Sequence, residues 1–334
     1  MHPNSSSSEP APSAAPRPAV AVVVPCYRET DQILDVLGRI GPEVARIFVV
    51  DDACPDGTGR LVRERCRDPR VEVVAHDVNR GVGGATITGY RRALASGADI
   101  VVKLDGDGQM APELIPALIR PLIEGRADYA KGNRFHSLDG LSAMPRARLI
   151  GNLALSFASK LSSGYWNLFD PTNGFTAIRA EVARALPLDK VSSSYFFESD
   201  MLFRLYLLRA MIVDVPMRAH YGSERSHLRI SRVIGEFARE HCRNAFFRIM
   251  YTYFLRDFSV ASVELTAGIL MLAFGCGFGA WQWIISSASG VPATAGTVLV
   301  AALPVILGFQ LLLAFLHFDV ANVPREPIHP DLTG

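Results

Sequence analysis

The 334-residue chain lacks any clustering of cysteine and carries almost no net charge. Its five cysteines are scattered, odd in number and without C-x-x-C spacing, which predicts free thiols in a reducing compartment and no zinc site. A formal net charge of +1 gives no support for a nucleic-acid-binding protein. The first 18 residues are rich in Ser, Pro and Ala, and they lack the basic start and apolar core of a signal peptide. We interpret residues 1–18 as a disordered tail and expect the segment that follows it to stay in the cytoplasm.

Charged residues are also missing from a long C-terminal stretch, because no Asp, Glu, Lys or Arg occurs between Leu265 and Phe318. One membrane crossing needs roughly 20 residues, so this stretch suits two. We predict two transmembrane helices within residues 258–318, near 260–285 and 298–318. The connecting turn holds no basic residue, whereas arginines flank the pair on both sides, so the positive-inside tendency places both termini, including the tail 319–334, in the cytoplasm. The alternative is a helical hairpin inside a protein core.

Four short apolar runs alternate with helical patterns between residues 19 and 110. The runs cover residues 19–24, 47–50, 71–75 and 100–104, and Pro25 is expected to end the first of them. This alternation predicts an α/β domain with a mostly parallel, doubly wound sheet. After the second run, Asp56 or Thr58 is a potential cap for the following helix.

The segment K-L-D-G-D-G-Q places Asp105 and Asp107 directly after the fourth apolar run. Residues two apart in an extended segment point the same way, so both carboxylates can converge on one cation at the end of a strand. An all-oxygen site of this kind suits Mg²⁺ or Mn²⁺. The alternative is an ordinary turn, since Asp-Gly pairs are common in turns.

A glycine cluster, N-R-G-V-G-G, precedes the third helical pattern. It lacks the G-x-G-x-x-G fingerprint, because Thr86 stands where the third glycine belongs. Two interpretations remain open: contact with phosphate at a helix N-terminus, or close packing of the helix on the sheet.

In order, V-V-V-P-C-Y-R-E, V-V-D-D-A-C-P-D-G-T, the glycine cluster and K-L-D-G-D-G-Q resemble the N-terminal half of family 2 glycosyltransferases with the GT-A (Rossmann-like) fold. The likeness is greatest to the polyprenyl-phosphate sugar synthases, which include dolichol-phosphate mannose synthase and undecaprenyl-phosphate glycosyltransferases. The resemblance implies a GT-A domain over residues 19–228. It also implies that Pro25, Tyr27 and Glu29 border the nucleotide, that Asp52 holds its base or ribose, and that Asp105, Asp107 and Gln109 form the metal site. Cys54 and Gly106 depart from the Ser and Ala that the family commonly has.

Further elements of the same resemblance lie in the second half of the domain. Arg134 follows an expected strand at residues 128–132 and is a potential phosphate clamp, because a guanidinium can hold two oxygens at once. Asp170 begins D-P-T-N-G-F, which resembles an element near the acceptor and sugar. Glu198 aligns with an acidic residue of the family, whereas Asp200 has no counterpart. Arg225 and Arg229 belong to an element that resembles Y-G-x-S-K-L, and we expect them to bind the nucleotide diphosphate or the acceptor phosphate.

Two segments have the pattern of amphipathic helices. The segment 146–161 has apolar residues at helical spacing with basic residues at its edges, and it either lies on a membrane surface or packs on the core. In 229–257, arginines alternate with aromatic and aliphatic residues just before the apolar stretch, which favours contact with anionic headgroups.

These patterns predict an enzyme of the inner or plasma membrane that transfers a sugar, with inversion, from a UDP- or GDP-linked donor to a polyprenyl phosphate. Its cofactor would be Mg²⁺ or Mn²⁺, and Asp107, Arg134 and Glu198 would carry the chemistry. An acceptor phosphate is already largely ionised, so it needs no dedicated base. The alternative is transfer to the hydroxyl of a lipid-linked glycan, for which Glu198 or Asp200 would be the base. A non-catalytic scaffold is a weaker alternative. A homo-oligomer is left open.

Overall fold

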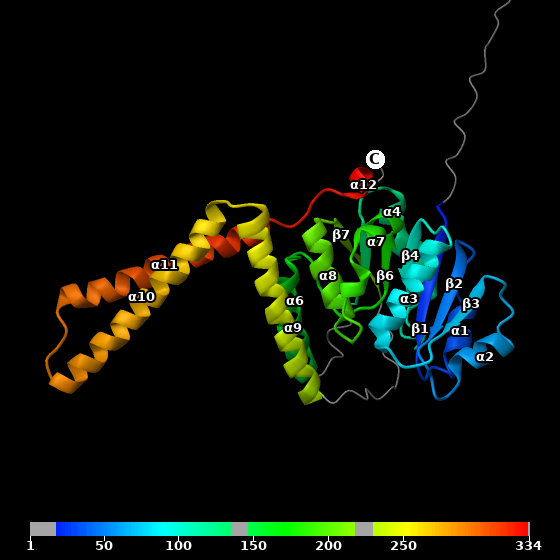
Figure 1. Cartoon of the computed structure of the whole chain (residues 1–334), viewed down its shortest axis with the longest axis horizontal. Coiled ribbons are helices and arrows are strands. Elements are labelled where there is room, and N and C mark those ends of the chain that lie inside the picture. Colours follow the sequence, from blue (N-terminus) through cyan, green and yellow to red (C-terminus); the bar gives the residue numbers. More distant parts are fainter. Residues whose placement is uncertain (1–17, 135–145, 218–229, 333–334) are drawn as a thin grey trace, which may run out of the picture.

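The structure, a computed structural model, describes residues 18–134, 146–217 and 230–332. Its centre is a seven-stranded mixed sheet with the strand order β3-β2-β1-β4-β6-β5-β7 (Figure 1). The strands are β1 Val20–Cys26, β2 Val44–Asp51, β3 Val71–Ala75, β4 Ile100–Lys103, β5 Tyr129–Asn133, β6 Thr176–Arg179 and β7 Ile212–Pro216. The predicted GT-A architecture with a mostly parallel sheet is confirmed.

Helices cover both faces of the sheet. Along the central strand β1, Val22 and Val24 pack into one apolar cluster with α1, α2 and α4, whereas Val23 packs into the other with α3, α7 and α8. Both faces of β1 are therefore buried, which explains why its sequence is continuously apolar rather than alternating. These helices are α1 Ile33–Gly38, α2 Thr58–Arg65, α3 Gly81–Ala95, α4 Ile115–Ile123, α7 Ala180–Ala185 and α8 Phe197–Leu208, with the short 3₁₀ turns η1 Pro112–Leu114 and η2 Leu188–Lys190.

Strand β6 runs antiparallel to both of its neighbours, β4 and β5. The sequence predicted a mostly parallel sheet and no direction for this strand. The antiparallel direction of β6 goes with the position of α6 (Arg146–Ser163), the helix between β5 and β6. It packs on α8 and on α9 (Ile230–Met250), so it is not a crossover helix of the kind that forces parallel strands.

The first strand continues through Pro25, where the sequence suggested its end. The Val23 carbonyl accepts the amide of Leu104 beyond β4, and the Cys26 carbonyl accepts the amide of Asp52 beyond β2. The backbone polar groups of successive strand residues point to opposite neighbouring strands, so those of Pro25 point toward β4. Pro25 lies beyond the last residue of β1 that pairs with β4. Its missing N–H therefore removes no ladder bond.

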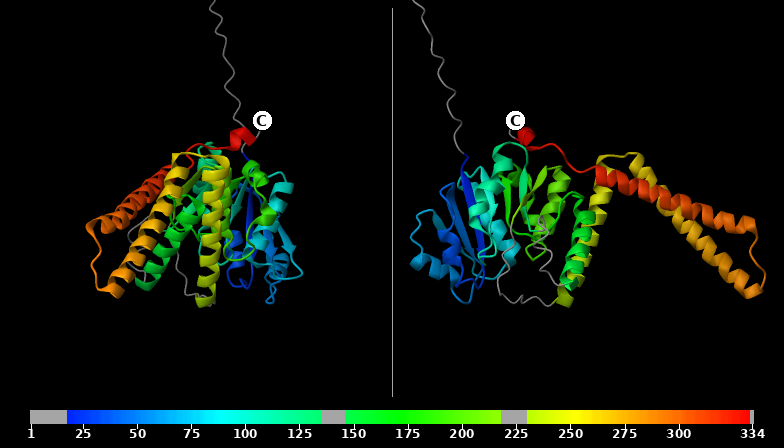
Figure 2. Two further views of the ribbon diagram at one scale, coloured as in Figure 1. Left: turned by 60° about the vertical axis from the view of Figure 1, so that its left-hand side comes forward. Right: turned by 180° about the vertical axis from the view of Figure 1, so that it is seen from behind.

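Beside the sheet, α6 and α9 lie next to each other, and two long helices project away from the domain (Figures 1 and 2). The π-helical turn η3 (Tyr251–Arg256) links α9 to α10 (Val260–Ser289), and α11 (Ala295–Ala321) returns beside it. Within the described residues these two helices are the ones long and apolar enough to span a membrane. Their apolar side chains are mostly exposed: Trp283, for example, is 77% exposed and Leu299 64%. A core hairpin would bury them.

The chain returns to the sheet domain after α11. The amides of Ile328 and His329, and the His329 ring, contact the buried Asp128 carboxylate at 2.8–3.0 Å. These residues lead into α12 (His329–Leu332), which packs near α7. The segment predicted as a simple tail is thus docked on the start of β5.

Candidate active site

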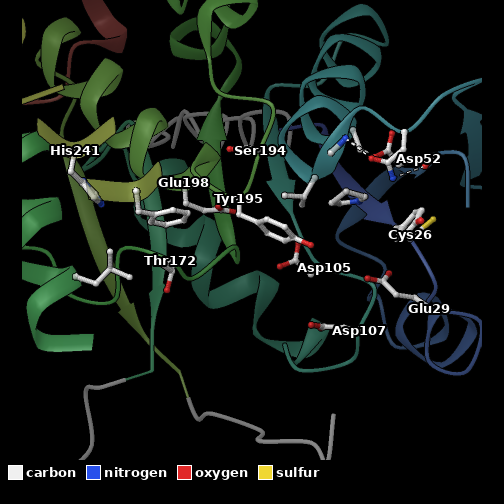
Figure 3. Close-up of a pocket in the computed structure, with 18 of the residues that line it drawn as sticks. Cys26, Glu29, Asp52, Asp105, Asp107, Thr172, Ser194, Tyr195, Glu198 and His241 are labelled. Carbon is white, nitrogen blue, oxygen red and sulfur yellow. Dashed lines mark hydrogen bonds between the residues drawn. The ribbon is translucent and has the colours of Figure 1, made fainter. Parts of the chain in front are cut away.

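A cavity of about 1230 Å³ lies between the carboxyl ends of the strands and the pair α6–α9. Figure 3 shows its labelled side chains running from His241 past Thr172 and Glu198 to Asp105 and then to Asp52. Because parallel strands end at the same edge of a sheet, residues that follow β1, β2 and β4 meet here. The predicted site residues that line it are Pro25, Tyr27, Glu29, Asp52, Asp105, Asp107 and Glu198.

A buried ammonium ties two of these carboxylates together. Lys103 Nζ lies 2.6 Å from Asp105 Oδ1 and 3.1 Å from Glu198 Oε1, and the lysine is fully buried at the end of β4. A buried charge needs such partners. Gly174 packs against this group so closely that a Cβ there would meet Lys103 Nζ and Asp105 Oδ2. This contact accounts for the glycine in D-P-T-N-G-F.

The other predicted metal ligands are arranged around Asp107. The Gln109 backbone amide donates to Asp107 Oδ1 at 3.0 Å, and Gln109 does not line the cavity. In the described ranges, no three His, Cys, Asp or Glu side chains are grouped as a metal site. Two carboxylates on one cavity wall nevertheless fit Mg²⁺ or Mn²⁺, because these ions usually take one or two protein carboxylates and complete their coordination with substrate phosphates and water. Asp105 and Asp107 are the residues that would hold it.

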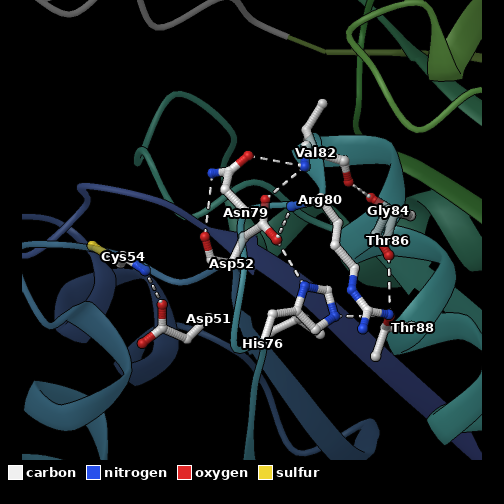
Figure 4. A network of polar contacts seen from close by, with 12 residues as sticks. Asp51, Asp52, Cys54, His76, Asn79, Arg80, Val82, Gly84, Thr86 and Thr88 are labelled. Carbon is white, nitrogen blue, oxygen red and sulfur yellow. Dashed lines mark hydrogen bonds and ion pairs between the residues drawn. The ribbon is translucent and has the colours of Figure 1, made fainter.

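The Asp52 carboxylate is surrounded by groups of the protein itself (Figure 4). Its Oδ1 lies 2.7 Å from His76 Nδ1 and accepts the Arg80 amide at 2.8 Å, and its Oδ2 accepts the Gly81 amide at 2.8 Å. The His76 ring also contacts Thr88 on α3. Asp52 therefore fixes the loop that enters α3 at the cavity edge, and its contact with a base or ribose stays a prediction.

The glycine cluster packs against another loop. Ser193 O accepts the amides of Gly83 and Gly84 at the start of α3, at 3.0 and 3.2 Å. A Cβ on Gly83 would meet the carbonyl of Ser192. The glycines thus allow the loop that carries Ser194 and Tyr195 to approach α3 and reach the cavity. The close packing observed is against this loop rather than against the sheet, and contact with phosphate stays a prediction, because Gly81 and Val82 line the cavity.

Asp51 has a structural role at the start of α2. Its Oδ1 accepts the amide of Cys54 and its Oδ2 that of Gly59, at 2.8 and 3.0 Å. The residue at the N-cap position is Gly57, with a φ of 72°, and it makes no side-chain cap. The expectation that Asp56 or Thr58 caps this helix was wrong, because a carboxylate from the preceding strand supplies the acceptor instead.

Arg134 and Asp170, predicted as phosphate or acceptor ligands, form an ion pair with each other. Arg134 Nε and Nη2 each donate to one Asp170 oxygen at 2.7 Å. Burial of Asp170 opposes its charge, but the hydrogen bonds from Arg134 and the positive charge of Lys131 outweigh this and lower the pKa of Asp170. Neither residue of the pair lines the cavity, and their contact with phosphate stays a prediction. Arg225 and Arg229 lie outside the described residues.

The two acidic residues of α8 differ in environment. Asp200 is buried and accepts hydrogen bonds from the Ser192 amide, Arg204 Nε and Asn244 Nδ2, at 2.9–3.0 Å, and it does not line the cavity. It therefore joins α8 to α9 and to the loop before α8. Glu198, two residues earlier, lines the cavity, so of the two only Glu198 is placed to meet a substrate.

Sequence reasoning missed Lys103 and His241 as site residues. A lysine within an apolar run was the available signal for Lys103, since a buried lysine requires an acidic partner. For His241 there was none beyond its place one helical turn after Phe237, which lines the same cavity.

The end of the cavity formed by α6 and α9 is apolar except for His241. The other lining residues there are Gly151, Ala154, Leu155, Ala158, Phe237 and Ala238. The cavity thus joins a carboxylate-rich end at the sheet to a mainly apolar end at α6 and α9, and α9 leads through η3 into α10.

The chain is 37% identical over 202 residues to the undecaprenyl-phosphate mannosyltransferase of Micrococcus luteus, a match that covers 59% of this chain and 82% of the relative. The model of "Glycosyl transferase family 2" matches residues 21–186. The chain belongs to glycosyl transferase family 2. As a family 2 member it is a glycosyltransferase, and the fold and the recognised family are both confirmed.

Two further likenesses complete the comparison. The UDP-N-acetylglucosamine–dolichyl-phosphate N-acetylglucosaminyltransferase of Methanococcus voltae is 30% identical over 216 residues, covering 60% of this chain and 86% of that relative. Glucosyl-3-phosphoglycerate synthase from Mycobacterium tuberculosis, solved with Mn²⁺ and UDP-glucose, has a TM-score of 0.53 at 22% identity, covering 69% of this chain and 79% of that one. The structural likeness supports the GT-A fold.

Proposed function

We propose that this glycosyltransferase transfers a sugar, with inversion, from a UDP- or GDP-linked donor to a membrane polyprenyl phosphate. The observation that carries the proposal is the cavity itself, which is rich in carboxylates at the strand ends and apolar at α6 and α9. The Micrococcus and Methanococcus relatives are named for different sugars, but both are named for a polyprenyl phosphate acceptor. The two names share the class of acceptor, so the acceptor class is the property that we extend to this chain.

The donor would lie along the strand ends. A divalent metal bound by Asp105 and Asp107 would neutralise charge on the departing diphosphate. Lys103 fixes the orientation of Asp105 and Glu198, since its ammonium contacts both carboxylates. The acceptor phosphate is already ionised near neutral pH and attacks the anomeric carbon without a base. Glu198 is therefore assigned to the cavity wall, in an ion pair with Lys103, rather than to proton transfer.

The acceptor would reach the cavity from the membrane. We assign α10 and α11 as two crossings, because they are long, uncharged over most of their length and exposed. On α6 and α9, exposed apolar residues such as Phe157, Phe246 and Phe247 form a surface suited to the bilayer interface. By the positive-inside tendency, the basic flanks favour a cytoplasmic catalytic domain with both termini on the same side. This arrangement brings the apolar end of the cavity next to the lipid.

The test is to reconstitute the full chain in vesicles that contain undecaprenyl phosphate and to supply UDP- and GDP-linked sugars with Mg²⁺ or Mn²⁺. We expect a glycosylated lipid, identified by mass, from at least one donor. Asp107→Asn should abolish this product, whereas Asp189→Asn, at an exposed surface pair with Arg91, should leave it unchanged. Product only on a hydroxyl acceptor would establish the alternative transferase, and activity that survives Asp107→Asn would contradict the metal site.

A further inference from the structure

His241 on α9 lies in the wall of the cavity, beyond Glu198 as seen from Asp52 (Figure 3). Only 5% of the residue is exposed. The edges of two aromatic rings enclose it, with ring centroids 4.8 Å away for Phe196 and 6.2 Å for Phe237. A polar ring in such a setting normally has a hydrogen-bond partner on each nitrogen.

The contacts of the ring identify which nitrogen carries the proton. His241 Nδ1 lies 2.8 Å from Ser162 Oγ, and Ser162 Oγ donates to the carbonyl of Ser159 at 3.2 Å. A hydroxyl has one hydrogen, so both bonds form together only if Nδ1–H donates to Ser162 Oγ. This assignment of the tautomer leaves a lone pair on Nε2.

The other nitrogen is unsatisfied. His241 Nε2 is buried and has no hydrogen-bond partner in the described part of the chain. Burial lowers the pKa of His241 to about 4, so the ring is neutral at physiological pH and Nε2 acts as an acceptor. A buried acceptor without a partner is unfavourable, and a ligand that supplies a hydrogen removes this penalty.

The chemistry of Nε2 selects the kind of group that it can meet. An ionised phosphate has only acceptor oxygens and cannot donate to a lone pair, whereas a sugar hydroxyl can. We propose that His241 is a specificity-determining residue whose Nε2 accepts a hydrogen bond from a hydroxyl of the donor sugar. The inference rests on the nucleotide-sugar donor of the proposed function, and it is independent of the acceptor.

Two substitutions separate this role from a structural one. In His241→Asn the short amide reaches Ser162 in place of Nδ1 and leaves the position of Nε2 empty. In His241→Gln the longer amide places a polar atom near the position of Nε2 and gives up the Ser162 contact. If Nε2 meets the sugar, Gln retains function and Asn loses it. If the ring serves only to hold Ser162, the order is reversed.

The experiment measures binding of UDP-glucose, UDP-N-acetylglucosamine, GDP-mannose, UDP and GDP to the full-length protein in detergent with Mn²⁺, by calorimetry. We expect wild type to prefer one sugar nucleotide over the matching free nucleotide, and His241→Asn to reduce that preference about tenfold. His241→Gln should stay within about threefold of wild type, and neither variant should change the affinity for the free nucleotide.

The outcomes that overturn the inference differ from those that overturn the proposed function. If His241→Asn keeps the wild-type sugar preference, or if His241→Gln loses as much as His241→Asn, the sugar contact is refuted while the transferase function stands. If wild type binds none of the sugar nucleotides, the proposed donor fails and the role of His241 fails with it.

Discussion

A buried ion pair joins the α10–α11 hairpin to the rest of the chain. Asp319, near the end of α11, accepts bonds from Arg248 Nη1 and Nη2 at 2.5 and 2.9 Å, from the Tyr253 hydroxyl at 2.6 Å and from Trp166 Nε1 at 2.8 Å. Arg248 is fully buried and also donates to the Leu161 carbonyl. Burial opposes the charge of Arg248, but the hydrogen bond and the charge of Asp319 outweigh it and raise the pKa of Arg248. The cluster joins α6, α9 and α11.

Replacing Asp319 by Asn removes the charge and keeps the shape, so Arg248 is left buried without a counter-ion. Breaking a buried pair in this way costs about 3–5 kcal/mol. Thermal unfolding of the purified full-length protein in detergent should therefore shift clearly downward for Asp319→Asn. The double variant Arg248→Met with Asp319→Asn should recover at least half of the loss, because no unpaired charge remains.

A matched control lies on α9, the helix that carries Arg248. Arg239 pairs with Glu240 at 3.2 Å but is 77% exposed, so Arg239→Gln should change stability by less than about 1 kcal/mol. The structural role of the Arg248–Asp319 pair is refuted if Asp319→Asn unfolds at the wild-type temperature, or if the double variant is less stable than both single variants.

The cavity residues support three further predictions. Lys103→Met leaves two neighbouring carboxylates without their shared ammonium, so sugar transfer should fall at least tenfold, whereas Arg126→Met at an exposed pair should have no effect on the rate. Gly174→Ala drives a methyl group into Lys103 Nζ and should reduce kcat with little change in the affinity for free nucleotide, and equal kcat would contradict the close packing. For His241, the unfolded chain takes up a proton near pH 6.5 and the folded chain only near pH 4, so stability should fall by about 3 kcal/mol as the pH drops between these values. Unfolding measured from pH 8 to 4 should show that slope in wild type and not in His241→Gln.

The sequence was sufficient to locate the strands and the edge at which their ends meet. Continuous β-branched runs such as 20–24 are buried on both faces, and in a parallel arrangement residues after neighbouring strands must gather at one edge. The order of strands and helices therefore predicts that Asp52, Asp105 and Asp107 lie close together, and the cavity contains all three.

The ion pairs in and beside the site could not be predicted from the sequence in the same way. The Arg134–Asp170 pair spans 36 residues and the Lys103–Glu198 pair joins β4 to α8. Each depends on how separate elements pack, which local patterns do not encode. The direction of β6 could not be predicted for a related reason, because the amphipathic pattern of α6 shows that one face is buried but not that the partner is α9.

Helix α9 connects the cavity to the base of the α10–α11 hairpin. Arg248 holds α9 to the base of the hairpin, and His241, seven residues earlier, lines the cavity. Seven residues of helix rise about 10 Å, so the cavity wall lies at a fixed, short distance from the point where the α10–α11 hairpin is attached. A polyprenyl phosphate has its reactive group at the membrane surface, and an enzyme acting on it must hold its sugar at that same level. A single helix anchored at both points meets this requirement, so loosening the Asp319 cluster should impair transfer to lipid more than binding of the donor.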